Sequence, residues 1–214
     1  MTQSDFAPIP LRPGQAMTAN QATGNGGQDQ SMPEIIGTQD DLAIRHEAPT
    51  DWPVIAQLNR DAFGGDFEVT LVQDLRQDGL IAAAYVVIAE QQIVGHAIFS
   101  HLPVKLDDRP VKSLALGPIS VREDYRSKGV GKFLINTGLQ AAQAQGTKAV
   151  FVLGDPAYYG RFGFNAHLAS HLNAPFEEDS FMALEIVDGA LDGDRGVVTY
   201  PDAWGLNTPG SISL

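Results

Sequence analysis

A short basic loop between an expected strand and an expected helix constrains the fold of this chain more than any other segment. Residues 114–121 are apolar and predict a strand, and residues 130–145 have the apolar spacing of a helix. The loop between them contains Arg126, Ser127, Lys128, Gly129, Val130, Gly131 and Lys132. The first N–H groups of a helix lack partners within the helix, and glycine lets a ligand approach the backbone closely. The loop therefore predicts a site for an anion, most naturally a phosphate group.

The distribution of charge supports an anion at this loop. The chain has a formal net charge of −12 and only 14 lysines and arginines. Four of these cations, at positions 122, 126, 128 and 132, fall within eleven residues. An acidic protein that gathers its few cations at one helix start is expected to bind a negative group there. The overall acidity argues against nucleic acid as a partner, because neutralising its phosphates needs a broad basic surface.

Two common phosphate-binding loops do not fit this spacing. A P-loop requires glycine where this chain has Arg126, and serine or threonine directly after Lys132. A dinucleotide-binding fingerprint that begins at Gly129 requires glycine at the position of Leu134. The pattern that fits is Arg-x-x-Gly-x-Gly, and the alternative to a binding loop is a solvated basic turn.

Length and composition narrow the class of protein. The 214 residues suffice for one domain with an appendage or for two small domains, and a hydrophobic content of 43% is enough for a core. The absence of cysteine excludes disulfides, thiolate zinc sites and a catalytic thiol. We find no apolar run long enough to span a membrane and no secretory signal. We therefore expect a cytoplasmic protein with no metal and no membrane partner.

The N-terminal region differs from the rest of the chain. Residues 1–40 are rich in glycine, proline and polar amides, with Phe6 as their one aromatic residue. Such a segment contains too little apolar material to offset the entropy of ordering. We expect residues 1–40 to be a disordered or loosely docked tail, and residues 41–214 to form the folded domain.

The hydrophobic pattern predicts strands and helices that alternate along the chain. Strands are expected at 41–47, 81–89, 93–104, 111–121, 148–154, 180–187 and 196–200. Helices are expected at 50–63, capped by Thr50, at 66–76, at 130–145, and directly after Asp155-Pro156. Interspersed strands and helices indicate a mixed α/β (α+β) domain around one twisted sheet.

The dipeptide Gly117-Pro118 interrupts the strand that leads into the basic loop. Proline cannot donate to a strand ladder and glycine weakens one, so the pair predicts a bulge or a split in the sheet. A split beside a phosphate loop would form a slot for an extended ligand.

Three motifs resemble the Gcn5-related N-acetyltransferase superfamily across roughly residues 41–202. The first is segment 116–121 leading into Arg126-x-x-Gly129-x-Gly131. The second, residues 159–164, matches Tyr-x-x-x-Gly-Phe, and the third, residues 180–185, resembles the sixth strand of a bacterial subfamily of predicted acetyltransferases. The resemblance implies one mixed, mostly antiparallel sheet of about seven strands, flanked by four helices and split between its fourth and fifth strands.

The resemblance also implies acetyl-CoA as the cosubstrate. Its pyrophosphate would lie on the backbone N–H groups of the loop, from Arg126 to Lys132. Its pantetheine arm would pair with the strand at Ile119, Ser120 and Val121, in the slot opened by the bulge. Whether the donor is acetyl-CoA or a longer acyl-CoA stays open.

These features predict an N-acetyltransferase that moves an acetyl group from acetyl-CoA to a primary amine of a small molecule, by direct attack in a ternary complex. Tyr159 matches the family's proton donor, and a phenol is a suitable acid for a thiolate of similar basicity. Its alternative role is that of a core aromatic. We expect no dedicated base on the strand before the loop, because Ser113, Ala115 and Gly117 cannot titrate usefully.

Two other functions remain open at this point. One is a protein or peptide N-acetyltransferase, and the other is a non-catalytic acyl-CoA-binding regulatory domain. The chain is expected to be a monomer or a homodimer.

Overall fold

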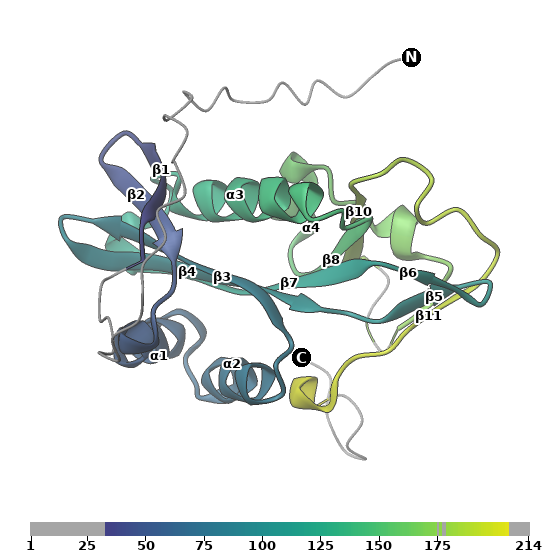
Figure 1. The fold of residues 1–214 in the computed structure, drawn as a ribbon, viewed down its shortest axis with the longest axis horizontal. Helices are drawn as coiled ribbons and strands as arrows, with labels where there is room; N and C mark the ends of the chain where they lie inside the picture. Colours follow the sequence, from purple (N-terminus) through teal and green to yellow (C-terminus); the bar gives the residue numbers. More distant parts are fainter. Residues whose placement is uncertain (1–32, 175, 177–178, 206–214) are drawn as a thin grey trace, which may run out of the picture. The chain divides into compact units, whose positions relative to one another are not determined.

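A seven-stranded sheet forms the centre of the computed structural model, which describes residues 33–174, 176 and 179–205 (Figure 1). In spatial order its strands are β1 (Ile35–Gln39), β2 (Leu42–His46), β3 (Ile81–Ala89), β4 (Gln92–His101), β7 (Ser113–Val121), β8 (Ala149–Leu153) and β10 (Phe181–Glu185). Neighbouring strands are antiparallel except β7 and β8, which are parallel. This arrangement confirms the predicted mixed, mostly antiparallel sheet.

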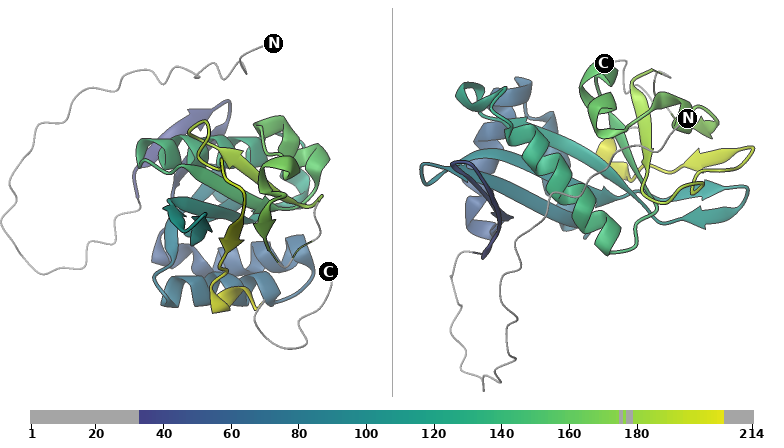
Figure 2. Two further views of the ribbon diagram at one scale, coloured as in Figure 1. Left: turned by 90° about the vertical axis from the view of Figure 1, so that its right-hand side faces the viewer. Right: turned by 90° about the horizontal axis from the view of Figure 1, so that it is seen from above.

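Four helices cover the two faces of this sheet (Figures 1 and 2). Helices α1 (Trp52–Phe63) and α2 (Phe67–Gln77) lie on one face, and α3 (Val130–Ala144) lies on the other, followed by the short α4 (Pro156–Tyr159). Each long helix turns an apolar stripe to the sheet: Leu71, Val72 and Leu75 are buried on α2, and Leu134 and Ile135 on α3. Five short 3₁₀ segments complete the helical structure: η1 (Pro49–Asp51), η2 (Glu123–Tyr125), η3 (Gly160–Phe162), η4 (Ala166–Ala169) and η5 (Asp202–Trp204).

A second, four-stranded sheet was not predicted. Its strands, in spatial order, are β6 (Arg109–Val111), β5 (Val104–Leu106), β11 (Gly196–Val198) and β9 (Leu172–Asn173). The expected strand 93–104 therefore ends at His101, and the segment expected to be a loop at 106–110 is part of a hairpin. Residues 196–198 join this second sheet rather than the main one. Val104 and Leu106 are buried in a separate core with Phe151, which explains why these short strands form their own layer.

Strand β1 forms one edge of the main sheet, and it lies inside residues 1–40, which we expected to be a tail. Its residues pair antiparallel with β2, although Ile35 and Ile36 are 44% and 41% exposed. Strand β1 is therefore a docked piece of residues 1–40, as a loosely docked tail allows, and backbone pairing orders it without burying its isoleucines. Residues 1–32 and 206–214 lie outside the described residues, so the remainder of the predicted tail stays a prediction.

Helix α1 begins differently from the prediction. Asp51, not Thr50, precedes its first residue, and the Asp51 carboxylate accepts a hydrogen bond from the Ala48 N–H at 2.7 Å. The same carboxylate forms a buried ion pair with Arg45 at 2.6 Å. The start of α1 is therefore attached to β2 by charge as well as by packing.

Acid should weaken the ion pair of Asp51 and also the contacts of a second carboxylate, that of Glu47. Arg76 and His96 contact the Glu47 carboxylate at 2.6 and 3.1 Å. Burial opposes ionisation of Glu47, but these hydrogen bonds outweigh it and lower its pKa below the ordinary value of 4.5. Burial also opposes ionisation of Asp51, yet its bonds to Arg45 and the Ala48 N–H lower its pKa below 3.8. Both carboxylates therefore stabilise the fold fully above their ordinary pKa values and lose that contribution as pH falls through the lower folded values.

We expect Glu47→Gln to reduce the free energy of unfolding by about 2 kcal/mol at pH 7, because it removes charge-assisted hydrogen bonds. Denaturant unfolding of both proteins between pH 7 and pH 3 measures the effect. The difference between them should shrink as the pH falls below the ordinary pKa of 4.5, because the unfolded wild-type chain then binds a proton that the folded carboxylate resists. A difference that stays constant across this range would contradict the assigned role of Glu47.

Helix α3 approaches β4 closely at Gly138. A Cβ atom at this position would overlap the ring of Phe99, which is itself 1% exposed. We expect Gly138→Ala to lower the free energy of unfolding by about 2 kcal/mol, despite the better helix propensity of alanine. Thermal unfolding checks this, with Gly65→Ala as the control because a Cβ there meets nothing within 4 Å. Equal melting temperatures for the two variants would refute the close approach.

Candidate active site

The predicted split in the sheet lies between β7 and β8. On its β4 side, β7 pairs Ile119 with Ala97 and Leu116 with Phe99, so Gly117 and Pro118 together oppose one residue of β4. On its β8 side, β7 is paired only from Ser113 to Leu116. Beyond Leu116 the two strands separate, which confirms both the bulge and the split. The backbone of residues 119–121 on the β8 side is thus not used by the sheet.

The basic loop connects the end of β7 to the start of α3. Gly129 precedes the helix in the left-handed conformation, with φ of 86°, which glycine adopts without the cost that a Cβ imposes. The first N–H groups of α3 therefore follow directly on a basic turn. Arg126 is held near the strand, where its Nε donates to the Val121 carbonyl oxygen at 3.4 Å.

One cation of the loop region is already paired. Arg122 forms a salt bridge with Asp124 at 2.7 Å and donates to the Gln92 side chain at 2.6 Å. Within the described ranges, Arg126, Lys128 and Lys132 form no salt bridge. These three cations are therefore available to an external anion, and Arg122 is not.

A pocket of about 200 Å³ is lined by residues of the split strand, the basic loop and α4 together. Its lining consists of Ala62, Phe63, Ile119, Val121, Arg126, Tyr158 and Tyr159. Four residues that the sequence singled out therefore meet here: two from the split strand, Arg126 from the loop, and Tyr159. Ser120, by contrast, turns its side chain to the opposite face of β7, where it is buried beside its cross-strand neighbour His96. Only the backbone of Ser120 is placed to contact a ligand in the split.

Tyr159 is positioned by the start of α4. The Asp155 carboxylate accepts a hydrogen bond from the Ala157 N–H at 2.9 Å, so the predicted helix start is confirmed. The Tyr159 ring makes edge contacts with Tyr158 and Phe164, at centroid distances of 5.0 and 5.9 Å. Burial, together with the neighbouring Tyr158, raises the pKa of Tyr159 to about 12. Its hydroxyl therefore carries a proton at neutral pH and can donate it.

Sequence reasoning missed Tyr158. Helix geometry predicts that adjacent residues point about 100° apart, so Tyr158 is expected to face away from Tyr159. However, α4 has only four residues, and both tyrosines line the same pocket. The tyrosine pair itself, next to the Tyr-x-x-x-Gly-Phe motif, was the signal that could have identified it.

No base is found beside the two tyrosines. Among the described residues that line this pocket, none is a carboxylate or a histidine. His96 is fully buried under α1, and its Nε2 is hydrogen-bonded to Glu47, as befits a histidine of the core. Asp66, at the start of α2, is paired with Arg60 at 2.6 Å.

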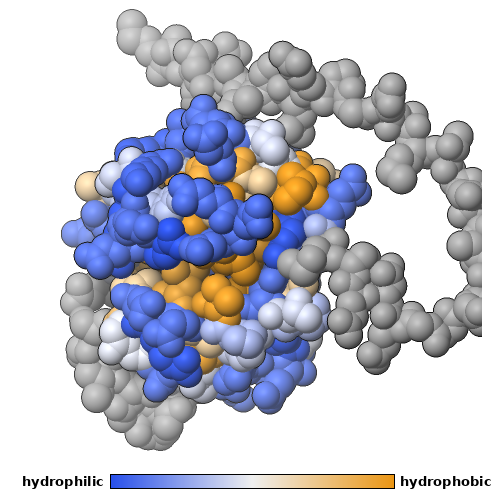
Figure 3. All heavy atoms as spheres, turned by 90° about the vertical axis from the view of Figure 1, so that its left-hand side faces the viewer, coloured by the Kyte–Doolittle hydropathy of each residue, from blue (hydrophilic) through white to orange (hydrophobic). Residues whose placement is uncertain are grey.

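Two larger pockets adjoin the first. The nearer one, of about 620 Å³, shares Val121 and Arg126 with it and adds Asp61, Glu123 and Asp124. This second pocket shares Asp61 and Arg122 with a groove of about 750 Å³ between α1 and strands β1 to β4. Figure 3 shows apolar residues gathered in a band on that side of the molecule, and Ile35, Val54 and Ile93 line the groove. Apart from the small pocket, the groove therefore offers the main apolar surface near the loop.

Two negative findings apply to the residues that the structure describes. No group of three or more metal-binding side chains is found among them. In the same part of the chain, no helix is long and apolar enough to cross a membrane.

The split sheet, the basic loop at a helix start and the tyrosine opposite them define an N-acetyltransferase fold. Comparisons with known proteins agree, because the model of the acetyltransferase (GNAT) family matches residues 52–164. The uncharacterised N-acetyltransferase YhbS of Escherichia coli K12 is 37% identical over 162 residues, which cover 74% of this chain and 96% of YhbS. The chain belongs to the acetyltransferase (GNAT) family and is an acyltransferase.

Solved structures give the same result. The crystal structure of YhbS from Escherichia coli in complex with CoA superposes with a TM-score of 0.70 at 34% identity, and covers 82% of this chain and 96% of that one. A GNAT family acetyltransferase from Brucella melitensis, in complex with acetyl-CoA, has a TM-score of 0.63 at 30% identity, and covers 76% of this chain and 97% of that one. These likenesses confirm the fold that the three sequence motifs predicted.

Proposed function

We propose that this protein transfers the acetyl group of acetyl-CoA to a primary amine of a small molecule, by direct attack in a ternary complex. The observation that carries the proposal is the small pocket, where the split strand, Arg126 and Tyr159 meet. Each of these parts has a separate task in acetyl transfer. Membership of the family favours this enzyme over a non-catalytic acyl-CoA-binding domain.

The donor would bind along β7 and the loop. The diphosphate would accept hydrogen bonds from N–H groups within residues 126–132, but not from those of Arg126 and Lys128, which already donate to the carbonyl oxygens of Glu123 and Tyr125. The cations Arg126, Lys128 and Lys132, which form no salt bridge among the described residues, would lie around it. The pantetheine arm would pair with the backbone at Ile119 and Val121, on the β8 side of β7. Support comes from two relatives at 30% identity or more whose structures contain CoA and acetyl-CoA.

Tyr159 would act on the sulfur atom of the donor. The amine attacks the thioester carbonyl carbon in its neutral form, and the negative charge that develops on the carbonyl oxygen needs a hydrogen-bond donor. As the tetrahedral intermediate collapses, the carbon–sulfur bond breaks and the thiolate accepts the Tyr159 proton. The proton that the new amide nitrogen releases returns, directly or through water, to the Tyr159 phenolate and restores the acid. The ammonium proton of the acceptor leaves to water before attack, since the described lining residues include no carboxylate or histidine.

The size and lining of the pocket favour a small acceptor. Its volume of about 200 Å³ is below the usual range for drug-sized ligands, and a donor on Ile119, Val121 and Arg126 would fill part of it. Ala62 and the 44% exposed Phe63 provide an apolar wall beside the tyrosines. An amine on a compact apolar group would fit this wall.

A peptide acceptor is the second candidate, because one observation favours it. The middle pocket shares lining residues with each of the other two, so the three pockets lie in a row from the tyrosines to the apolar groove beside α1. An extended peptide that entered along this path would pass the carboxylates of Asp61 and Glu123, which attract a cationic N-terminus.

Acetyl transfer to two matched panels separates these candidates. One panel contains small primary amines with apolar substituents, and the other contains peptides that carry a free N-terminus or a lysine. We expect turnover with the small amines and little with the peptides. Efficient transfer to peptides, with loss of that transfer when Val54 on the groove is changed to Asp, would favour the second candidate. A cytoplasmic location and a monomeric or homodimeric state remain predictions.

A further inference from the structure

The hydroxyl group of Tyr158 lies against the backbone of the basic loop. A Cβ atom on Gly131 would overlap the Tyr158 Oη atom, but would lie 3.7 Å from ring atom Cζ. Gly131 is the second residue of α3, so the hydroxyl is close to the first N–H groups of that helix. Tyr159 is turned elsewhere, because its ring packs over Gly154 just after β8. The two adjacent tyrosines thus reach different parts of the site.

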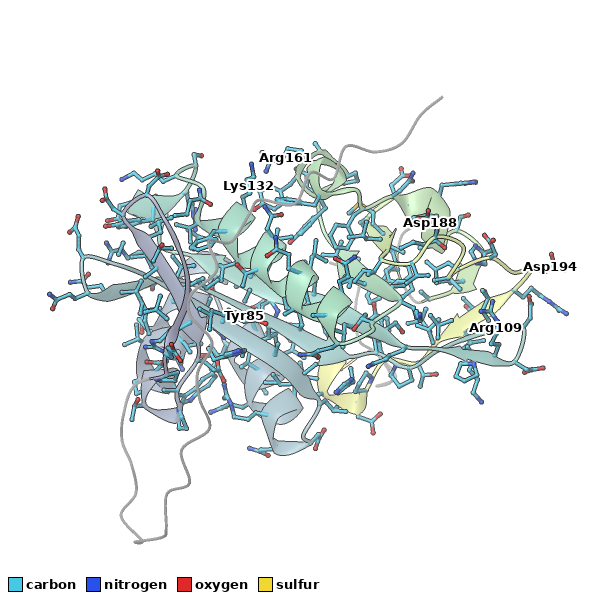
Figure 4. All side chains as sticks on the ribbon, turned by 45° about the horizontal axis from the view of Figure 1, so that its top comes forward. Tyr85, Arg109, Lys132, Arg161, Asp188 and Asp194 are labelled. Atoms are coloured by element: carbon cyan, nitrogen blue, oxygen red, sulfur yellow. The ribbon has the colours of Figure 1, made fainter. Side chains whose placement is uncertain are left out.

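Arg161 fixes the ring of Tyr158 in this position. Its guanidinium carbon lies 4.5 Å from the centroid of the Tyr158 ring, and its Nε donates to the Tyr158 carbonyl oxygen at 3.1 Å. Figure 4 shows Arg161 and Lys132 on the same side of the molecule, on η3 and α3. The contacts with Arg161 therefore hold the Tyr158 ring with its hydroxyl toward the loop, on the same side of the molecule as the cations Arg161 and Lys132.

We propose that Tyr158 is a cosubstrate-positioning residue whose hydroxyl donates a hydrogen bond to the diphosphate of CoA. This inference rests on the proposed function, in which the loop holds that diphosphate. The geometry separates the roles of the two tyrosines: Tyr158 holds the phosphates beside Gly131, and Tyr159 protonates the sulfur. A phenol that remains protonated is suited to this task, because it offers a donor to an anion without adding negative charge.

Calorimetry with two ligands tests the role of Tyr158. For Tyr158→Phe we expect the affinity for CoA to fall about tenfold, since one hydrogen bond to a charged group is lost. The affinity for pantetheine, which has no diphosphate, should not change. At saturating acetyl-CoA the variant should keep its kcat, so that the effect appears in KM. Tyr159→Phe is the matched control, and we expect it to show the reverse pattern.

Three outcomes would overturn the proposal. Equal weakening of CoA and pantetheine would mean that the lost hydroxyl does not contact the diphosphate. A loss of kcat with unchanged CoA affinity would make Tyr158 the acid. If the unaltered protein binds no CoA, the proposed function itself fails and Tyr158 loses its role with it, whereas failure of the Tyr158 role alone leaves CoA binding to the unaltered protein intact.

A double-mutant cycle with Gly131 adds a second test. Gly131→Ala should displace the Tyr158 hydroxyl and weaken CoA binding about as much as Tyr158→Phe does. In the Tyr158→Phe background the overlap is gone, so Gly131→Ala should cause no further loss. Losses that simply add would show that Gly131 and Tyr158 act independently, against the proposal.

Discussion

Replacing Tyr159 by phenylalanine should lower kcat roughly 100-fold or more and leave the affinity for acetyl-CoA nearly unchanged. The variant keeps the ring that packs against Tyr158 and Phe164 but lacks the proton for the departing thiolate. Steady-state kinetics and calorimetry on the same preparations measure the two quantities. Because burial raises the pKa of Tyr159 to about 12, the wild-type rate should not decline up to pH 10 through loss of this proton.

A change of leaving group provides the control for this result. An acetyl thioester of a more acidic thiol needs less protonation as its carbon–sulfur bond breaks. The Tyr159→Phe variant should therefore recover much of its rate with such a donor, while the wild-type enzyme gains little. An unchanged rate with acetyl-CoA itself would remove Tyr159 from the mechanism.

Replacing Gly129 by valine should weaken acetyl-CoA binding at least tenfold. Gly129 has φ of 86°, and a β-branched residue resists this conformation, so the turn that leads into α3 would change. The N–H groups that the diphosphate is expected to use would then no longer converge. Titration calorimetry with acetyl-CoA measures the loss.

Gly146→Val is the matched control for this variant. Gly146 follows the other end of α3 with φ of 74°, and a Cβ there meets nothing within 4 Å. Both substitutions therefore impose a similar backbone cost, which thermal unfolding records, but only the change at Gly129 lies in the loop. Equal donor affinities for the two variants would contradict the assignment of the loop.

Gly131 needs a different explanation from the one that its place in the motif predicts. The sequence suggested that glycine is required so that phosphate can approach the backbone. In the structure the space beside Gly131 is occupied by the Tyr158 hydroxyl. A side chain there would displace Tyr158 first, and any effect on the donor would follow from that displacement.

The central sheet and its split were predictable because their causes are local. Gly117-Pro118 cannot continue a ladder, and the pairing between β4 and β7 changes register at that point. The apolar run at 148–154 predicts a parallel, central strand; β8 is parallel to β7, but it lies next to the edge strand β10 rather than at the centre of the sheet. In both cases the residue types leave few alternatives for the backbone.

The second sheet and strand β1 have no hydrophobic pattern strong enough to predict them. Strands β5, β9 and β11 have two or three residues each, and β11 pairs with segments far away in the sequence. Strand β1 lacks the alternation of buried and exposed residues, since its isoleucines are largely exposed. Pairing of distant backbone segments determines β9 and β11, whereas β1 and β5 each belong to a hairpin with a two-residue turn, where backbone pairing rather than hydrophobic periodicity determines the strand.

Val54 and Phe63 illustrate the same limit on helix α1. Their helical spacing with Ile55 and Leu58 predicts that both side chains are buried in the core, yet they are 49% and 44% exposed. Each lines a pocket next to the loop instead, Val54 the groove and Phe63 the small pocket. The helical spacing of apolar residues therefore does not predict whether a side chain packs in the core or lines a binding site.

Titration calorimetry of the unaltered protein with acetyl-CoA and with acetyl-pantetheine tests the central assignment most directly. If the loop holds the diphosphate, acetyl-CoA should bind with micromolar affinity, and acetyl-pantetheine should bind at least 100-fold more weakly because it lacks the group that the loop N–H groups and cations recognise. Equal affinities for the two donors, or no binding of acetyl-CoA, would contradict a diphosphate site at residues 126–132.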